Sequence, residues 1–509
     1  MPASPEPPAQ PTLPLPLPLA TPAHLKPLLH ALTGNTSAPA DVLLRLSVAD
    51  IDRRGLARRP DLPGDVAAAL AAVPDWSVRS ELAGNPHLPA AVQRVLADDD
   101  DPRVRSRLAE GAEYFSTFGP RGNRLPDPLP YEVYELLARD PAPKVRRALA
   151  FNRHLPDGLR SRLLDDPDPR TAALTAEEWP HVPGRRIEEF LTRGTGGFSR
   201  ELLLCHLDGP LPAETARALL ADIGSPANVS STGGSPVDAS PAGDSRDTSL
   251  MRKIAEVAAL DAELTGRLLA HPDLRPGLAA NPTLDPRHIA ELAGDADNGV
   301  RAAVVARRGL DPALRESIPV TYEERSSAVV NWLLTEELSE QEQSAYARSR
   351  HQILRKTLAL RPGLSDEVVR ILADDESFAV RLFVCERQPN APGPLLARIA
   401  EQWTGYSRRD MLAHPNFPAD AADRLARSGE PQDRAVAAAH PGLSSERIEA
   451  LLVDAEAPVR HRAATNGAIE ASRLVELLAG ADTAVASGAA ANPRLPAAAM
   501  RLVLDQAGW

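Results

Sequence analysis

The sequence predicts an all-α solenoid of about sixteen helical repeats, each about 26 residues long. Three observations lead to this prediction. An arginine, often preceded by valine, recurs at intervals of 26 residues, and apolar residues before it follow the spacing of an amphipathic helix. Of the 509 residues, 43% are hydrophobic but only 4% are aromatic. Leu, Val and Ala must therefore fill the core, as they do in stacked helical layers.

One repeat is clearest in residues 129–155. The apolar residues of its first half stand at i, i+4, i+7 and i+8, a helical stripe, and they are Leu129, Val133, Leu136 and Leu137. In its second half Val145 and Leu149 are four residues apart, which indicates a second, shorter helix. Two such helices cannot bury both stripes within one repeat, so the pattern also predicts stacking of the repeats.

The recurring arginine defines what we call the reference position of each repeat. Thirteen of the sixteen reference positions are arginine. The positions are Arg53, Arg79, Arg105, Arg146, Ala172, Arg200, Arg252, Arg275, Arg301, Ser327, Arg355, Arg381, Arg408, Arg434, Arg460 and Ala486. A repeat sustained over this length is a stronger signal than any short motif in the chain.

Residues at fixed distances from the reference position receive a physical role. An aspartate often lies four residues before it, and we expect it to cap the second helix: Asp75, Asp101, Asp168, Asp297 and Asp482. Pro102 and Pro169 follow such an aspartate and suit a first helical position. A leucine three residues after the reference position is the expected core contact: Leu56, Leu82, Leu108, Leu149, Leu203, Leu278 and Leu358.

Six residues after the reference position the chain often has asparagine, at Asn85, Asn152, Asn281, Asn466 and Asn492. We expect this residue to end the second helix by bonding the local backbone. His206, His414 and His440 occupy the same position. They are therefore better interpreted as substitutes for asparagine than as metal ligands, and no metal site is predicted.

Breaks in the repeat suggest a division of the chain. Residues 1–23 are proline-rich and are predicted to be a disordered leader. Residues 24–224 form an N-terminal solenoid block, 225–249 a flexible Ser/Gly/Pro linker, and 250–509 a C-terminal block. Residues 331–354 resemble one longer helix, and the chain should end on a helix over 497–505.

An insertion near residues 112–126 interrupts the N-terminal block. It gathers Tyr114, Phe115 and Phe118, beside Arg121, in a chain that otherwise has few aromatic residues. The rings could pack against neighbouring helices. Alternatively, the insertion is a recognition loop, since insertions in repeat proteins often bind partners.

The arginines at the reference position, such as Arg79, Arg105 and Arg146, also have two interpretations. Each could pair with the aspartate four residues earlier, or with an aspartate in the corner of the adjacent repeat. Alternatively, the row of guanidinium groups could line one face and bind an acidic partner or phosphates. The structural interpretation is favoured, because the chain carries a formal net charge of -12.

The repeat resembles the leucine-rich repeat variant family in residues 88–111 and 129–152, which combine DPxxVR-like and LAxN-like segments at fixed spacing. The resemblance implies alternating α- and 3₁₀-helices in a right-handed superhelix. The best-known member of that family carries a cysteine-rich iron–sulfur segment, but this chain has only Cys205 and Cys385, so no cofactor is expected. Both cysteines are predicted to be small buried residues. HEAT-like repeats fit less well because their period is longer.

The functional prediction is a non-catalytic scaffold that binds a protein partner. No phosphate-binding loop, nucleophile elbow or zinc-protease motif is present, so we do not expect an enzyme. A nucleic-acid-binding solenoid that uses the arginines and an enzyme with a site in the concave groove are the alternatives. The N-terminal segment has no basic region and alternates Leu with Pro, so we expect a cytoplasmic monomer without membrane contact.

Overall fold

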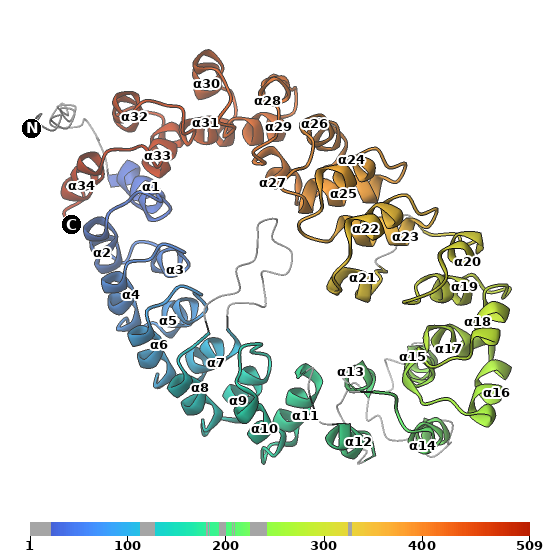
Figure 1. Cartoon of the computed structure of the whole chain (residues 1–509). Coiled ribbons are helices and arrows are strands. Elements are labelled where there is room, and N and C mark those ends of the chain that lie inside the picture. The colour runs from blue at the N-terminus through green and yellow to red at the C-terminus, as the bar shows by residue number, and fades with distance from the viewer. Residues whose placement is uncertain are drawn as a thin grey trace, which may run out of the picture. The chain divides into compact units, whose positions relative to one another are not determined.

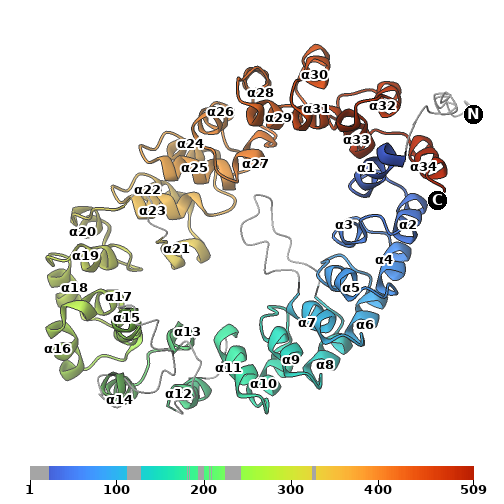
Figure 2. The same cartoon turned by 180° about the vertical axis from the view of Figure 1, so that it is seen from behind.

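The computed structural model describes residues 22–111, 128–179, 182, 184–192, 200–205, 207, 209–223, 242–323 and 328–509. Its described elements are helices, and one isolated parallel bridge joins Leu211 to Ala258 (Figures 1 and 2). The predicted all-α repeat fold is thereby confirmed. The chain divides into two compact units, each treated separately below. Unit 1 combines Met1–Leu137 with Pro389–Trp509, and unit 2 is Ala138–Gln388.

The helices alternate between the two halves of the repeat. Even-numbered helices come from the first half and odd-numbered helices from the second, and every described reference position lies on an odd-numbered helix. In unit 1 the odd-numbered helices are α1 (Pro22–Thr33), α3 (Arg53–Ala57), α5 (Trp76–Ala83), α7 (Pro102–Glu110), α27 (Arg408–Leu412), α29 (Pro431–Ala437), α31 (Ala457–Ala464) and α33 (Thr483–Ala491). The even-numbered ones are α2 (Ala40–Val48), α4 (Gly64–Ala71), α6 (Ala90–Ala97), α8 (Tyr131–Ala138), α26 (Gly393–Gln402), α28 (Ala419–Leu425), α30 (Ser445–Leu452), α32 (Ala471–Leu478) and α34 (Ala497–Gln506).

Unit 2 continues the same alternation. Its odd-numbered helices are α9 (Pro143–Ala150), α11 (Pro169–Glu178), α13 (Arg200–Cys205), α15 (Ala242–Val257), α17 (Arg275–Ala280), α19 (Asn298–Val305), α21 (Asn331–Thr335), α23 (Gln352–Ala359) and α25 (Phe378–Arg387). Its other helices are α10 (Asp157–Leu164), α12 (Gly184–Thr192), α14 (Ala213–Ile223), α16 (Ala262–Ala270), η3 (Pro272–Leu274), α18 (Pro286–Leu292), α20 (Pro312–Ser317), α22 (Glu340–Ala347) and α24 (Asp366–Ala373). Among the described elements, η3 is the one 3₁₀-helix, and the second halves of the repeats are α-helical.

Helices of like parity pack on one another and form two layers in unit 1. In the odd layer α3 contacts α5, and α5 contacts α7; in the even layer α2 contacts α4, and α4 contacts α6. The predicted core leucines lie between the layers, and Leu56, Leu82 and Leu108 are fully buried. The small residue that follows each of them is buried as well, as in Ala57 and Ala109.

Unit 1 brings the two ends of the described chain together. Helix α1 packs on α33, and α34 contacts both α1 and α2 (Figures 1 and 2). Asn35 Nδ2 donates to the main-chain oxygens of Ala490 and Asn492, at 2.8 and 2.7 Å. At the outer edge Arg501 forms a bidentate ion pair with Asp41. The first and last repeats therefore stack on each other as neighbouring repeats do.

The predicted helix caps are confirmed. The carboxylates of Asp75, Asp101, Asp168, Asp297 and Asp482 each accept a main-chain N–H from the first turn of the following helix. Pro102 and Pro169 are the first residues of α7 and α11. Each cap satisfies a donor that the helix itself leaves unpaired, so the corner aspartates fix where each odd-numbered helix begins.

Two predicted core residues are exposed in the structure. Leu136 on α8 is 44% exposed, whereas Val133, Tyr134 and Leu137 are buried, so the buried face of this helix is turned by one residue from the predicted stripe. Cys205, at the end of α13, is exposed, whereas Cys385 is buried as predicted. Cys205 instead lies beside Lys253. Burial opposes the charged form of Lys253, but its hydrogen bonds to Glu256 and Cys205 raise its pKa above the ordinary value.

The prediction of a single long helix over residues 331–354 is also wrong. The stretch is divided among α21, α22 and the start of α23. Ser339 forms a capping box with Glu342 and so begins a new helix. His351 then begins α23; its ring contacts the Arg315 carbonyl at 2.7 Å and the Tyr322 hydroxyl at 3.1 Å. Local caps and a buried polar contact therefore override the helical periodicity.

Candidate functional site

Arginines at the reference position contact the next repeat. Arg79 Nε and Nη2 donate to the carboxylate of Asp99, at 2.6 and 3.0 Å. Arg146 reaches Asp166 in the same way, at 2.7 and 2.9 Å. The same separation of 20 residues recurs in Arg275–Asp295, Arg355–Asp375 and Arg434–Asp454. These contacts match the predicted pairing with an aspartate in the adjacent repeat's corner.

The partner aspartate also holds its own corner in place. Asp99 Oδ1 accepts a hydrogen bond from the main-chain N–H of Asp101, at 2.9 Å. Asp166 Oδ1 accepts the equivalent hydrogen bond from the main-chain N–H of Asp168. Arg105 Nη1 donates to the main-chain oxygen of the same Asp99, at 2.5 Å. Asp99 therefore joins the arginine of the preceding repeat to the arginine of its own repeat, and Asp295, Asp375 and Asp454 do the same. We call this chain of contacts the Arg–Asp ladder.

The ladder is buried and electrostatically paired. The side chains of Arg146 and Asp166 are only 11% and 4% exposed. The hydrogen bond to Asp166 raises the pKa of Arg146, and the hydrogen bond from Arg434 lowers the pKa of Asp454. Removing one partner from such a pair leaves a buried charge without compensation, which is costly. The contacts of Arg146 therefore assign it a role in joining repeats.

A second set of contacts between repeats uses the position six residues after the reference position, which we call the bracket position. Asn85 Nδ2 donates to the main-chain oxygens of Ala57 and Arg59 in the preceding repeat, at 2.8 and 2.7 Å. Asn281, Asn466 and Asn492 make the equivalent pairs of bonds. The Oδ1 atom accepts the N–H two residues later, as predicted, but the bonds to the preceding repeat were not predicted.

Histidine and arginine replace asparagine at the bracket position. His414 and His440 accept the N–H two residues later through Nδ1, both at 3.1 Å, which confirms that they substitute for asparagine. His206 lies outside the described residues. Arg59 Nη1 donates to the Thr33 and Asn35 carbonyls, and Arg307 and Arg361 reach carbonyls of their own preceding repeats. The bracket role of these arginines was not predicted, because a charged residue between two helices is normally expected to be exposed to solvent.

The predicted binding residues come from the recognition loop and from the reference position of three repeats. Tyr114, Phe115, Phe118 and Arg121 all lie outside the described residues. Arg79, Arg105 and Arg146 belong to three odd-numbered helices, α5, α7 and α9, and their placed contacts are those of the ladder. A role for these residues in partner binding stays a prediction.

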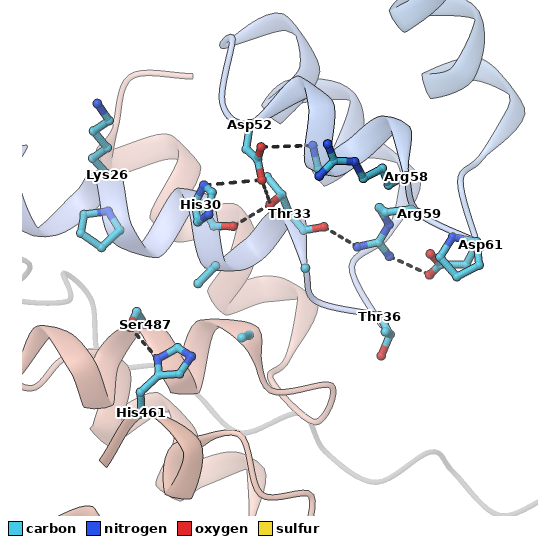
Figure 3. Close-up of a pocket in the computed structure, with 16 residues that line it drawn as sticks. Lys26, His30, Thr33, Thr36, Asp52, Arg58, Arg59, Asp61, His461 and Ser487 are labelled. Atoms are coloured by element: carbon cyan, nitrogen blue, oxygen red, sulfur yellow. Dashed lines mark hydrogen bonds and ion pairs between the residues drawn. The ribbon is translucent and has the colours of Figure 1, made fainter. Parts of the chain in front are cut away.

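A cavity of about 870 Å³ opens between the odd-numbered helices of the first and last repeats in unit 1 (Figure 3). Side chains of α1 face those of α31 and α33 across it, with the α3 corner at one side. The lining residues are Lys26, Pro27, His30, Ala31, Thr33, Gly34, Thr36, Asp52, Gly55, Arg58, Arg59, Pro60, Asp61, His461, Ser487 and Ala491. Its volume is in the range of ligand-binding pockets.

Hydrogen bonds hold most polar groups around the cavity in place. Asp52 caps α3 through the Gly55 N–H, at 3.1 Å, and accepts the Thr33 hydroxyl, at 3.2 Å. His30 Nδ1 lies 3.5 Å from the same carboxylate, and Arg59 pairs with Asp61 at 2.6 Å (Figure 3). These groups form a fixed frame rather than a set of free donors and acceptors.

His461 and Ser487 form the opposite wall. His461 Nδ1 lies 3.0 Å from the Ser487 hydroxyl and 3.2 Å from the Ala484 main-chain oxygen. Which of these contacts is a hydrogen bond depends on whether Nδ1 or Nε2 of His461 carries the hydrogen. The described residues contain no group of three or more His, Cys, Asp or Glu side chains arranged to hold a metal ion. No described helix is both long and apolar enough to cross a membrane.

Comparison with known proteins gives no family assignment. No protein-family model and no curated protein matches the chain. Among solved structures, the crystal structure of an engineered protein, a target of the Northeast Structural Genomics Consortium, aligns with 13% identity over 87% of this chain and 95% of that one. Its TM-score is 0.18, which is too low to indicate a shared fold. The resemblance to leucine-rich repeat variant proteins stays a prediction.

Proposed function

We propose that the chain is a helical-repeat scaffold that binds a protein partner on the odd-numbered helix layer of unit 1. The cavity of about 870 Å³ on that layer is the observation that carries the proposal. The ladder and bracket residues satisfy main-chain groups and bury charge between repeats, whereas the cavity offers space and, at Lys26, an exposed side chain that the stacking does not use. Repeat proteins commonly bind partners on such a layer.

The contacts of the Arg–Asp ladder favour a protein partner over nucleic acid. Binding to a phosphate backbone requires arginines that are free to contact phosphates. The arginines of Arg79–Asp99 and Arg355–Asp375 instead make bidentate bonds to carboxylates of the next repeat. A row of guanidinium groups is therefore already neutralised within the stack.

The Ser487–His461 contact is the one feature that invites the groove-enzyme alternative. A nucleophilic serine needs an acceptor nitrogen on its histidine. In this structure the Ser487 hydroxyl is also within 3.1 Å of the Ala484 oxygen, and His461 Nδ1 contacts that same oxygen. The Ser487 hydroxyl is thus positioned to donate to a main-chain carbonyl, an arrangement that supports a binding surface better than acyl transfer.

Affinity capture tests the proposal. The full-length chain, immobilised and incubated with native cell extract, should retain specific proteins that an unrelated all-α protein of similar charge does not retain. Deleting residues 112–126 should remove part of this set if the aromatic insertion is a recognition loop. Capture of nucleic acid alone, or of nothing beyond the control, would refute the scaffold; unchanged capture after the deletion would refute only the loop.

A further inference from the structure

The cavity in unit 1 has a largely apolar floor made of small residues. Ala31 and Gly34 belong to α1 and the turn that follows it, and Ala491 ends α33. Pro27 and Pro60 add apolar surface at the sides. An apolar side chain of a partner can be buried here at a gain of roughly 25 cal/mol per Å².

The polar groups of the cavity include one cation without a partner. Arg58 forms a bidentate ion pair with Glu81, and Arg59 pairs with Asp61, so both guanidinium groups are compensated. The other carboxylate of the lining, Asp52, caps α3. Lys26 is exposed, and none of the carboxylates in the described part of the chain lies within ion-pair distance of it. Lys26 is thus a cation available to a ligand.

Two further arginines on the odd layer of unit 1, Arg409 and Arg462, also lack a carboxylate partner among the described residues. Arg409 on α27 and Arg462 on α31 are close enough to repel each other. Burial lowers the pKa of Arg462, and the neighbouring Arg409 lowers it further. Neither guanidinium has a carboxylate partner among the described residues. Two guanidinium groups without carboxylate partners therefore lie on odd-numbered helices of unit 1.

We propose that the cavity between α1 and α33 binds a short acidic peptide segment of the partner protein. This assignment rests on the proposed function and specifies its ligand. An apolar side chain of the segment occupies the floor between Ala31 and Ala491, and a neighbouring Asp or Glu carboxylate pairs with the Lys26 ammonium group. Charge-assisted hydrogen bonds of this kind are the stronger class of polar contact.

Peptide selection tests the assignment while the partner is still unidentified. A random-peptide phage library is selected on the full-length chain, and enriched peptides are synthesised with a fluorescent label. Their affinities are measured by fluorescence anisotropy for the wild type, Lys26→Glu, Ala31→Phe and Lys144→Glu. Lys144→Glu is the matched control, because Lys144 is an exposed lysine on another odd-numbered helix, α9, in unit 2. Thermal unfolding establishes that each variant folds, and Lys26→Ala replaces any variant that does not.

The expected result is enrichment of peptides that combine Asp or Glu with apolar residues. Their affinity should fall about tenfold or more for Lys26→Glu and for Ala31→Phe, and should be unchanged for Lys144→Glu. Enrichment of basic peptides, no enrichment, or equal binding by all variants would overturn the assignment. If extract proteins are still captured in that case, the scaffold stands and only the cavity assignment fails; displacement of the peptides by single-stranded RNA would indicate a nucleic-acid site instead.

Discussion

Arginine is used in this protein as a connector between repeats. Its planar group offers several donors at once, so a single side chain can satisfy a carboxylate and a carbonyl in different repeats. Arg355 illustrates this, because it bonds Asp375 and Glu376 in the next repeat and the Ser349 oxygen in its own corner. Lysine, with one nitrogen, cannot replace such a contact.

Replacing one ladder arginine should destabilise the fold strongly. Arg146→Ala leaves Asp166 buried without its partner, and we expect a loss of about 3–5 kcal/mol in unfolding free energy, measured by urea denaturation. Arg146→Lys should recover only part of it. Arg94→Ala, which breaks the exposed pair with Glu132, is the control and should change little. A stable Arg146→Ala variant with impaired partner binding would instead favour the ladder as a binding surface.

His440 makes stability depend on pH. Its Nδ1 must be unprotonated to accept the Gly442 N–H, and burial lowers its pKa from the ordinary value of 6.5. The unfolded chain therefore takes up this proton first as the pH falls, so the folded state loses stability below about pH 6.5. His440→Asn should flatten this part of the melting-temperature profile and leave it unchanged above about pH 7.5. His271→Asn, at an exposed histidine, is the control; identical profiles for the wild type and His440→Asn would contradict the assignment.

The corner of each repeat sets the ends of the helices. Asp297 accepts the N–H groups of Gly299 and Val300, at 2.6 and 3.0 Å, and begins α19. Asp297→Ala should cost about 1 kcal/mol, because a helix loses its N-cap. Asp297→Asn keeps an oxygen acceptor and should cost distinctly less, as measured by urea denaturation. Equal losses in the two variants would show that charge, rather than capping, is what this aspartate contributes.

Helix positions were predictable because caps and core residues repeat along the chain. The roles of Asp297 and Leu278 follow from side-chain type and spacing alone. The bracket contacts were not predictable, because Asn281 binds main-chain oxygens of Ala255 and Ala258, and any residue carries such an oxygen. Helix faces were predicted less well than helix positions, as Leu136 shows, since small rotations of a helix depend on packing partners.

The candidate cavity could not have been predicted, because it depends on contact between the two ends of the chain. Lys26 and Ala31 face Ser487 and Ala491 only through the stacking of α1 on α33. Nothing in the spacing of the repeats indicates that the first repeat follows the last. In the structure, contacts of the bracket type show that the first repeat follows the last. Asn35 bonds the main-chain oxygens of Ala490 and Asn492, just as Asn492 bonds those of Ala464 and Asn466.

Stacking of the first repeat on the last should contribute as much stability as stacking within the chain. Asn35→Ala leaves two main-chain oxygens without donors, at roughly 1–3 kcal/mol for each buried group. Asn492→Ala removes the equivalent bonds between consecutive repeats, so it provides a matched comparison. Similar losses in urea denaturation are expected, together with faster amide hydrogen exchange in α1 and α34 of Asn35→Ala.

Ser317→Ala is the control for the Asn35 comparison, since the Ser317 hydroxyl bonds the Leu314 oxygen at an exposed site within α20. It should change both readouts little, because water can replace an exposed hydrogen bond. If Asn492→Ala destabilises the protein while Asn35→Ala behaves like Ser317→Ala, the two ends do not stack in solution. The cavity would then lose one of its walls, and the peptide selection should fail on the wild-type chain as well. The Asn35 experiment therefore also tests the structural basis of the proposed binding site.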